Sequence, residues 1–458
     1  MKVAHIYLWS ILSSVVLLGG CISNTHHSAS LHVGIASVDI TPGDRAVLLP
    51  LSARAIVFHQ GDEKACLVSC DVIAISKETS DQIRQTASEK TGIPFSNIVI
   101  VATHNHGGAI HEHFVDKVVE SIITAQEQCR PTELFAGTGQ EHRVSFNRRF
   151  LMKDGTIRFN PGRTDDGVSF DGGFPFLNPD IIKPVGPIDP DIGIAQFKAK
   201  GTEQPFGALV NFAMHVCTCT GERYTSEFPT VVEQNLQKHF GSDFISVFGA
   251  GACGDINHFD ITKPYTQNTQ EKQHNEITVP IADNLTETIL EKTELTKQTP
   301  ALKTLSRTTA IPLQTYTQMD LDWANTATAN QFKDFPGTDY NQVGFLAGVR
   351  ARKIIKLAAL HEKSSVWNLE VQVIRLSEQT AIVTLPGELF VELGLLIKEQ
   401  SPFEHTFVIE MANENLLYVP TAKAFGEGSY ETVNSFLAPS GGEILTKTAV
   451  NLLNKIDF

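Results

Sequence analysis

Two histidines one residue apart are the first side chains in this sequence that suggest chemistry. They lie in the run VATHNHGGA, Val101–Ala109, in which an apolar strand ends at His104 and His106. Side chains at positions i and i+2 of a strand point to the same side, so both imidazoles can face one cavity. We therefore predict that this run is half of a metal site. The alternative is that they are ordinary surface or core histidines, which are also common at the end of a strand.

Three other polar residues follow apolar runs in the same way. His215 follows FGALVNFAM, Asp255 lies in GAGACGD after another apolar run, and Glu388 lies in LPGE after a third. In α/β sheets, ligand sites form at the carboxyl ends of the strands. We therefore expect these residues and His104 to lie at one edge of a sheet.

The segment around Asp255 also has the spacing of a dinucleotide-binding loop, with Gly249, Gly251 and Gly254 in the order G-x-G-x-x-G. Such a loop requires a helix directly after it, whose N-terminus receives the pyrophosphate. Here the following residues are polar and are soon interrupted by Pro264. The sequence therefore argues against a dinucleotide site.

Hydrophobic periodicity predicts the elements that position these residues. Strands are predicted at Leu31–Thr41, Ala53–His59, Ala65–Ile75, Asn97–Thr103, Thr132–Gly139, Phe206–Met214, Phe244–Phe248, Trp367–Arg375, Ala381–Leu385 and Thr406–Glu410. Helices are predicted at Ser76–Thr91, Phe114–Gln128, Thr230–His239, Pro280–Lys292, Gln318–Phe335, Gly344–Glu362 and Glu443–Asn454. Strands that alternate with helices favour an α/β fold with a mixed, mainly parallel central sheet flanked by helices.

We expect residues 32–458 to form a single domain, with a possible helical insertion at about 315–365 around Pro336-Gly337. The segment from Asn160 to Gly193 is rich in proline, glycine and aspartate. Long segments of this kind are uncommon in compact domains unless they are functional, so we predict a loop over the active site. The alternative is a flexible surface excursion.

The composition is that of a globular protein. Of 458 residues, 42% are hydrophobic and 19% are charged, and the formal net charge is −14. The sequence contains no block rich in lysine or arginine. A nucleic-acid partner is therefore not expected, because the phosphate backbone attracts basic surfaces. No protein partner is indicated.

The first residues resemble an export signal. Lys2 precedes an apolar run from Ile6 to Leu18, which is too short to span a bilayer comfortably, and LGGC follows. We predict that residues 1–21 are a lipoprotein signal peptide, that Cys21 carries the lipid, and that residues 22–31 are a tether. The protein would then be an exported bacterial lipoprotein, held to a membrane in the periplasm or at the cell surface. A plain signal peptide is the alternative.

Six further cysteines allow 15 disulfide connectivities, among which the sequence does not choose. In an exported protein some of them can pair. They are Cys66, Cys70, Cys129, Cys217, Cys219 and Cys253.

Five motifs taken together resemble the catalytic domain of the neutral/alkaline ceramidase family, which are zinc amidases that hydrolyse the N-acyl bond of ceramide. These motifs are THNHGG, NFAMH followed by SEFP, GACGDIN, LPGE and SYE, and the resemblance runs from Val33 to Glu431. It implies a Zn²⁺ ion held by His104, His215, Glu388 and Tyr430. Two imidazoles and a carboxylate are a familiar open zinc site. Tyrosine is an unusual ligand, so Tyr430 could instead donate a hydrogen bond to the substrate.

The resemblance also implies roles for other residues. A zinc-activated water attacks the amide carbonyl, and His106 lies beside the oxyanion or passes the proton to the leaving amine. Asp255 is expected to orient a metal-bound histidine, or else to cap its loop. Asn147 and Arg148, in SFNRRFLMKDG, are predicted to bind polar groups of the substrate, or else to pin a loop.

This chain departs from the family pattern at three points. Asn257 stands where ceramidases carry a serine needed for activity, and an amide cannot act as a nucleophile, although it can donate a hydrogen bond to an oxyanion. Glu227 stands where the family usually has aspartate. The chain ends soon after its last predicted helix, so we expect no C-terminal β-sandwich.

The sequence thus predicts a zinc-dependent amide hydrolase whose substrate is ceramide or another N-acylated lipid or sugar. Two alternatives stay open. One is a surface lipoprotein without catalytic activity that binds a lipid or a glycan on the same fold. The other is an amidohydrolase-type barrel, which requires eight regular strand-helix units and a metal-binding aspartate after the last strand.

Overall fold

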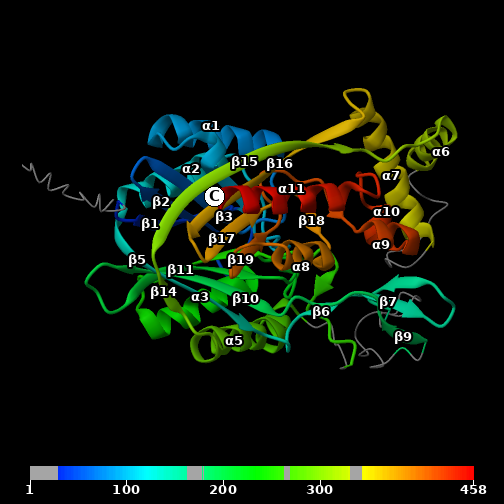
Figure 1. The fold of residues 1–458 in the computed structure, drawn as a ribbon. Coiled ribbons are helices and arrows are strands. Elements are labelled where there is room, and N and C mark those ends of the chain that lie inside the picture. Colours follow the sequence, from blue (N-terminus) through cyan, green and yellow to red (C-terminus); the bar gives the residue numbers. More distant parts are fainter. Residues whose placement is uncertain (1–28, 162–177, 179, 263–268, 331–342, 458) are drawn as a thin grey trace, which may run out of the picture.

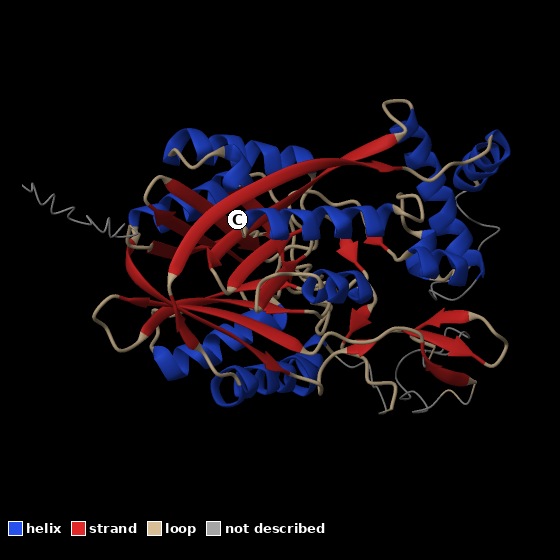
Figure 2. Ribbon diagram, in the orientation of Figure 1, coloured by secondary structure: helices blue, strands red, loops and turns tan. Residues whose placement is uncertain are grey.

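Two β-sheets packed face to face form the centre of the protein (Figures 1 and 2). The structure is a computed structural model that describes residues 29–161, 178, 180–262, 269–330 and 343–457. The predicted signal peptide, Cys21 and residues 22–28 of the predicted tether lie outside these residues. Across the described ranges, none of the helices is both long enough and apolar enough to span a membrane.

The larger sheet has nine strands in the order β12-β11-β10-β5-β1-β2-β3-β4, and β14 also pairs with β5. These strands are β1 (His32–Asp39), β2 (Ser52–Gln60), β3 (Glu63–Cys70), β4 (Ile98–Ala102), β5 (Arg130–Gln140), β10 (Asp191–Ala199), β11 (Pro205–Phe212), β12 (Ile245–Ala250) and β14 (Thr296–Gln298).

The α/β class and the mixed sheet flanked by helices are confirmed, but the pairing is mostly antiparallel. Only β3–β4 and β11–β12 are parallel among the described pairs of this sheet. The expectation of mainly parallel pairing overlooked short links such as the turn at Gly61 between β2 and β3. A short link of this kind joins antiparallel neighbours, whereas parallel neighbours need a long crossover.

The smaller sheet has four strands in the order β15-β16-β17-β19. Its strands are β15 (Pro300–Pro312), β16 (Val366–Ser377), β17 (Thr380–Thr384) and β19 (His405–Ile409), and only β17–β19 is a parallel pair. Side chains alternate between its two faces, as in any strand. Ile382 of β17 packs against the larger sheet, whereas Ala381 and Val383 face the helices on the other side.

Helices cover the outer faces of both sheets, so the molecule has four layers. On the larger sheet, α1 (Lys77–Thr91) and α2 (Phe114–Glu127) pack on β1 to β4, while α3 (Glu227–Phe240) and α5 (Val279–Glu287) pack on β10 to β12. On the smaller sheet lie α8 (Val391–Glu399) and α11 (Gly441–Ile456). Two stacked sheets are incompatible with a closed barrel, so the amidohydrolase-type alternative is wrong.

Shorter elements gather at one end of the sandwich, on the right of Figure 1. Within the segment predicted as a loop, β9 is a strand that joins β7 and β8 in a small sheet, and residues 162–177 and 179 of that segment lie outside the described residues. The short strands are β6 (Phe146–Asn147), β7 (Arg149–Met152), β8 (Ile157–Phe159), β9 (Ile181–Pro184), β13 (Ile256–Asn257), β18 (Glu388–Leu389) and β20 (Tyr418–Val419). The remaining helices are α4 (Gln270–Gln273), α6 (Gln318–Ala329), α7 (Val343–His361), α9 (Ala422–Glu427) and α10 (Tyr430–Val433), with single turns at Phe95–Asn97, His274–Thr278 and Thr288–Lys292.

All six cysteines in the described residues are free thiols, so none of the possible disulfides forms. Burial raises the pKa of the Cys129 thiol to about 11, and Cys66 and Cys70 are fully buried in the core. Thiols in such surroundings are unreactive.

Close approach of the two sheets predicts a sensitive position at Gly193 of β10. A Cβ atom there would lie 2.5 Å from the ring of Phe407 on β19. We expect Gly193→Ala to lower the free energy of unfolding by about 1–3 kcal/mol through overpacking. Chemical denaturation measures the change. The control is Gly43→Ala, because a Cβ at that turn meets no atom within 4 Å, and equal stabilities of the two variants would contradict this account of the sheet packing.

Candidate active site

Three predicted site residues converge where parallel strand pairs end. His104 follows β4, His215 follows β11, and Glu388 begins β18 just after β17. Each of these strands belongs to a parallel pair, so the carboxyl ends of two sheets meet at one place. The edge predicted from the sequence is therefore shared between the two sheets.

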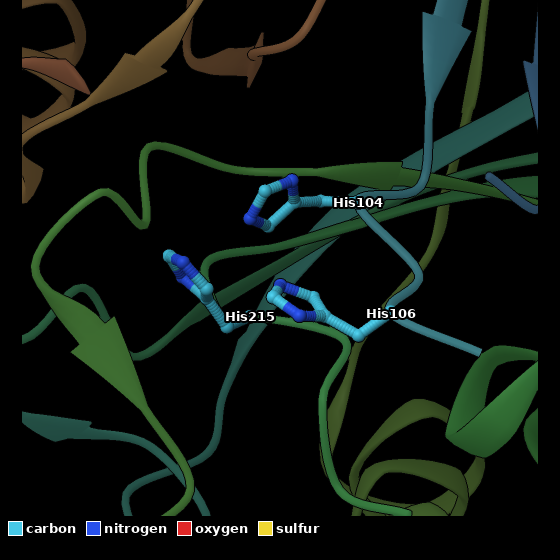
Figure 3. Close-up of side chains that lie close together, drawn as sticks. All are labelled: His104, His106 and His215. Atoms are coloured by element: carbon cyan, nitrogen blue, oxygen red, sulfur yellow. The ribbon is translucent and has the colours of Figure 1, made fainter. Parts of the chain in front are cut away.

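The donor atoms of these residues lie within a few ångströms of one another. Nε2 of His104 and Nε2 of His215 are each 3.4 Å from Oε2 of Glu388. All three side chains are buried. The ring centroid of His106 lies 5.0 Å from that of His104, and Figure 3 shows the three imidazoles turned toward a common space.

The site has the properties of a metal centre. Nε2 of His104 and Oε2 of Glu388 are buried and have no hydrogen-bond partner among the described residues. Buried polar atoms normally have partners, so this pair of atoms is suited to a bound cation. Nδ1 of His104 lies 2.9 Å from the carbonyl of Ile73, which holds the proton on Nδ1 and leaves the Nε2 lone pair directed into the site. The group of His104, His106 and His215 could also hold an ion.

The ionisable side chains of the site shift one another's pKa values. Burial by itself would lower the pKa of His104. The charge of Glu388 acts in the opposite direction, and the pKa of His104 is raised overall. Burial would raise the pKa of Glu388, but the neighbouring His104 outweighs it and holds that pKa well below its usual range. Burial and then the charge of Arg148 lower the pKa of His215. The set therefore offers a carboxylate and at least one neutral imidazole.

The loop that carries His104 is held in a strained conformation. His104 has a φ of 62°, in the left-handed region that is uncommon for residues other than glycine. Gly107 and Gly108 follow, and a Cβ atom on either would collide with the carbonyl oxygens of Thr225 and Asp71. The two glycines thus let the loop pass between neighbouring segments. Strain of this kind tends to be found at functional sites.

His106 lies at the solvent boundary of the site. Its side chain is exposed, yet desolvation by the surrounding protein, and next the charge of His104, lower its pKa. The ring is therefore accessible to solvent on one side and surrounded by protein on the other. Its backbone N–H donates to the carbonyl of Val216 at 3.0 Å, which ties this loop to the one after His215.

Arg148 lies beside His215 at the back of the site. Its Nη1 is 3.1 Å from Nε2 of His215, its Nη2 donates to the carbonyl of Gly254 at 2.6 Å, and its Nε donates to Glu431 at 2.9 Å. Arg149 donates to the other oxygen of Glu431 at 3.1 Å. Glu431 is fully buried and pairs with both buried guanidinium groups, and Glu427 also pairs with Arg149. Arg148 is therefore a fixed positive charge next to the candidate metal donors.

Asp255 and Asn147 join the loops around the site. The carboxylate of Asp255 accepts from Nδ2 of Asn147 at 2.8 Å and from the backbone N–H of Val391 at 2.8 Å. Burial raises the pKa of Asp255 to about 6. Both hydrogen bonds join loops, as in the loop-capping alternative predicted for Asp255, and neither is made to a histidine. Nδ2 of Asn147 also donates to the carbonyl of Pro187, so its N–H groups form hydrogen bonds within the protein.

Asn257 is likewise bound to its surroundings. Its Nδ2 donates to Oδ1 of Asn160 at 3.1 Å, and its Oδ1 accepts from the backbone N–H of Phe259 at 3.1 Å. The side chain is buried. The amide at the position of the family's serine therefore closes the loop after β12, and one N–H of its amide group is used for this purpose.

A tyrosine that the sequence did not indicate, Tyr418, also lies beside the candidate donors. Tyr418 of β20 is the register partner of Glu388 in β18, and paired residues of neighbouring strands point to the same side. Tyr418 is buried, which keeps its pKa well above the ordinary value, and the charge of Glu388 adds to this effect. Tyr430 packs one ring further out, 5.5 Å from the ring of Tyr418, and its hydroxyl lies 3.4 Å from Nδ2 of Asn434.

The only signal for Tyr418 in the sequence was its place in the short apolar run LLYVP. The strand it forms has two residues, which is too short for a periodicity to identify. Glu431 was visible as the glutamate of SYE, but its two arginine partners are distant in sequence.

Comparison with solved structures places this geometry on a known fold. No family model matches the chain, and no curated protein matches it in sequence. The crystal structure of neutral ceramidase from Pseudomonas aeruginosa is similar, with a TM-score of 0.66 and 17% identity over 94% of this chain and 75% of that chain. A ceramidase complexed with C2 also has a TM-score of 0.66, at 16% identity over 93% of this chain and 76% of that chain. The chain therefore has the fold of a ceramidase catalytic domain, as the sequence motifs predicted.

The buried ion pairs of Glu431 predict a large effect on stability. We expect Glu431→Gln to lower the free energy of unfolding by about 3 kcal/mol, because it removes the carboxylate paired with the buried Arg148 and leaves Arg149 with Glu427 alone. Denaturant titration measures this loss. Glu427→Gln is the matched control, since Glu427 is partly exposed and pairs with Arg149 and the exposed Lys423, and it should cost at most about 1 kcal/mol. Similar losses in both variants would show that Glu431 does not hold the site together.

Proposed function

We propose that this protein, which has the fold of the neutral ceramidases, is a zinc-dependent hydrolase of N-acyl bonds. The observation that carries the proposal is the convergence of two buried imidazoles and a buried carboxylate, those of His104, His215 and Glu388, beside the exposed ring of His106. Two nitrogen ligands and one oxygen ligand suit zinc and leave coordination positions for water and a substrate oxygen.

His104, His215 and Glu388 are the proposed ligands, and Tyr418 replaces Tyr430 as the tyrosine of the site. The support for Tyr418 is its register with Glu388 and its burial. A bound zinc ion would supply Lewis acidity for the amide carbonyl and acidity for a water molecule. Because Tyr418 keeps its proton, its hydroxyl can instead donate a hydrogen bond to the carbonyl oxygen of the substrate.

The residues of the chain provide the remaining functions. His106 is reachable from solvent and adjacent to His104, so it can accept the proton of the attacking water and deliver it to the amine that leaves. Arg148 is a fixed cation beside His215 that favours the negative charge developing on the carbonyl oxygen. Asn257 has no hydroxyl group, and its amide donates a hydrogen bond to Asn160. The proposed reaction therefore uses no side-chain hydroxyl at that position.

The segments around the histidines also favour an apolar acyl group. Ile73, whose carbonyl fixes His104, and Ile110, shortly after His106, are among the few large hydrophobic side chains that are exposed in the described structure. Apolar side chains exposed beside a polar site commonly contact an apolar part of the ligand.

The first test is metal content. Purified protein should contain about one zinc ion per chain, and His104→Ala and His215→Ala should lose it because each removes a ligand. His106→Ala should keep it, since His106 is proposed to carry a proton. Elemental analysis by mass spectrometry gives the stoichiometry. His113→Ala, an exposed histidine, is the control. Wild-type protein without stoichiometric metal would rule out the site, and loss of zinc in His106→Ala would make His106 a ligand.

The second test is amide hydrolysis by the zinc-loaded protein. N-acyl sphingoids, N-acyl amino acids and N-acetylated sugars form the panel, and released amine is measured. At least one class should be cleaved in a zinc-dependent way, and His106→Ala should lower kcat by about 10²–10⁴-fold. Binding of a substrate without turnover in any class would favour the alternative of a non-catalytic binding protein.

A further inference from the structure

A buried glutamate behind the candidate metal centre has no part in the proposed reaction. Glu410 directly follows β19 and is completely shielded from water. Burial raises the pKa of its carboxyl group to about 8. A buried carboxyl group is costly, whether or not it is ionised, unless hydrogen bonds replace the lost hydration. The partners of Glu410 therefore indicate what this side chain does.

Both oxygens of Glu410 accept hydrogen bonds from segments around the candidate ligands. Oε2 accepts from the backbone N–H of Leu389 at 2.7 Å and from that of Cys253 at 3.2 Å. Oε1 accepts from the thiol of Cys253 at 3.0 Å. Leu389 directly follows Glu388, and Cys253 lies in the loop after β12. One carboxyl group thus joins the strand of a candidate ligand to a neighbouring loop.

Glu388 needs such support because its own strand is short. β18 consists of two residues and pairs only briefly with β20. The backbone N–H of Glu388 donates to the carbonyl of Leu417 at 2.9 Å, and the next N–H, that of Leu389, is bound by Glu410. Both N–H groups of this strand are therefore held. The backbone that directs the Glu388 side chain toward the two imidazoles is fixed by these bonds.

The residues after Glu410 bind β4, the strand that leads to the first candidate ligand. The backbone N–H of Ala102 donates to the carbonyl of Met411 at 3.3 Å, and that of Asn413 donates to the carbonyl of Ile100 at 2.7 Å. Met411 and Asn413 have φ values of 58° and 59°, which are uncommon for residues other than glycine. Backbone strain of this kind tends to be found at functional sites. The same short segment thus contacts both β4 and β18.

We propose that Glu410 is a positioning residue of the metal centre, whose carboxyl group fixes Glu388 so that it faces His104 and His215. This inference rests on the proposed function, because it concerns the same site. Glu410 acts through the backbone groups that its oxygens reach, so the length of its side chain is decisive. Removing a group that orients a metal ligand commonly lowers metal affinity by about 10–100-fold.

Two substitutions separate the reach of this side chain from its acidity. Glu410→Gln keeps the length and an oxygen that can accept both N–H groups, so the Kd for zinc should stay close to that of the wild type. Glu410→Asp keeps the acidic group but is shorter by a methylene, so the Kd for zinc should rise by about 10–100-fold. Competition with a chromophoric chelator measures both constants.

Glu141→Asp is the matched control for shortening a buried glutamate. Glu141 is also buried and accepts from the backbone N–H of Arg143 at 2.7 Å and from the hydroxyl of Thr288 at 2.9 Å, and neither partner carries a candidate ligand. Its Kd for zinc should equal that of the wild type. Thermal unfolding of each metal-free variant shows whether it is folded.

The two Glu410 variants can each overturn the proposal. A loss of zinc affinity in Glu410→Gln would show that acidity, and not reach, is what the site requires. Wild-type affinity in a folded Glu410→Asp would show that the reach is unimportant. If Glu410→Asp does not fold, Glu410→Gln decides alone, with retained affinity supporting the proposal and lost affinity contradicting it.

Hydrogen exchange separates this proposal from the proposed function, because it requires neither metal nor turnover. In metal-free protein, mass spectrometry of the peptide that contains Leu389 should show faster exchange in Glu410→Asp than in the wild type or Glu410→Gln. If this holds but the wild type binds no zinc or cleaves no amide, Glu410 positions Glu388 and the proposed hydrolase fails. If zinc binds and amides are cleaved, but neither exchange nor zinc affinity changes in Glu410→Asp, the hydrolase stands and the positioning role is wrong.

Discussion

The burial of charge where the two sheets meet is the constraint on which the site depends. His104, His215, Glu388 and Arg148 are almost completely shielded from water. Removing such groups from water costs several kcal/mol each unless partners replace the lost hydration. Each partner must therefore be fixed by the fold, and a segment that moved away would leave a buried charge behind.

Glu431 shows how far this requirement reaches along the chain. It lies near the C-terminal end but binds Arg148 and Arg149, which stand on the short strands after β5. The same arginine that Glu431 holds contacts His215, which follows β11. Three distant segments are thus fixed by one ionic cluster, and the position of a candidate ligand follows from it.

The proposed hydrolysis also takes account of Asn257, which stands where the resemblance to ceramidases predicts a serine. The loop after β12 is closed by hydrogen bonds of Asn257 and Asp255, so its residues act mainly as supports. We propose that His106 transfers the proton and that Arg148 stabilises the developing charge; His106 lies beside His104, and Arg148 lies beside His215. Of these two residues, His106 is exposed to solvent, whereas Arg148 is buried and also holds the site together.

The sequence alone determined the local features of this protein. The apolar runs before His104, His215 and Glu388 identified strands and the residues at their ends, because hydrophobic periodicity reflects local burial. The resemblance of its motifs to those of the ceramidase family also predicted the fold. Tertiary structure decided which residues become partners, because contacts such as that between Arg148 and Glu431 join positions remote in sequence. It also decided that most strands pair antiparallel, that Tyr418 is in register with Glu388, and that Asn257 hydrogen-bonds within its loop region, since each depends on how separate segments pack.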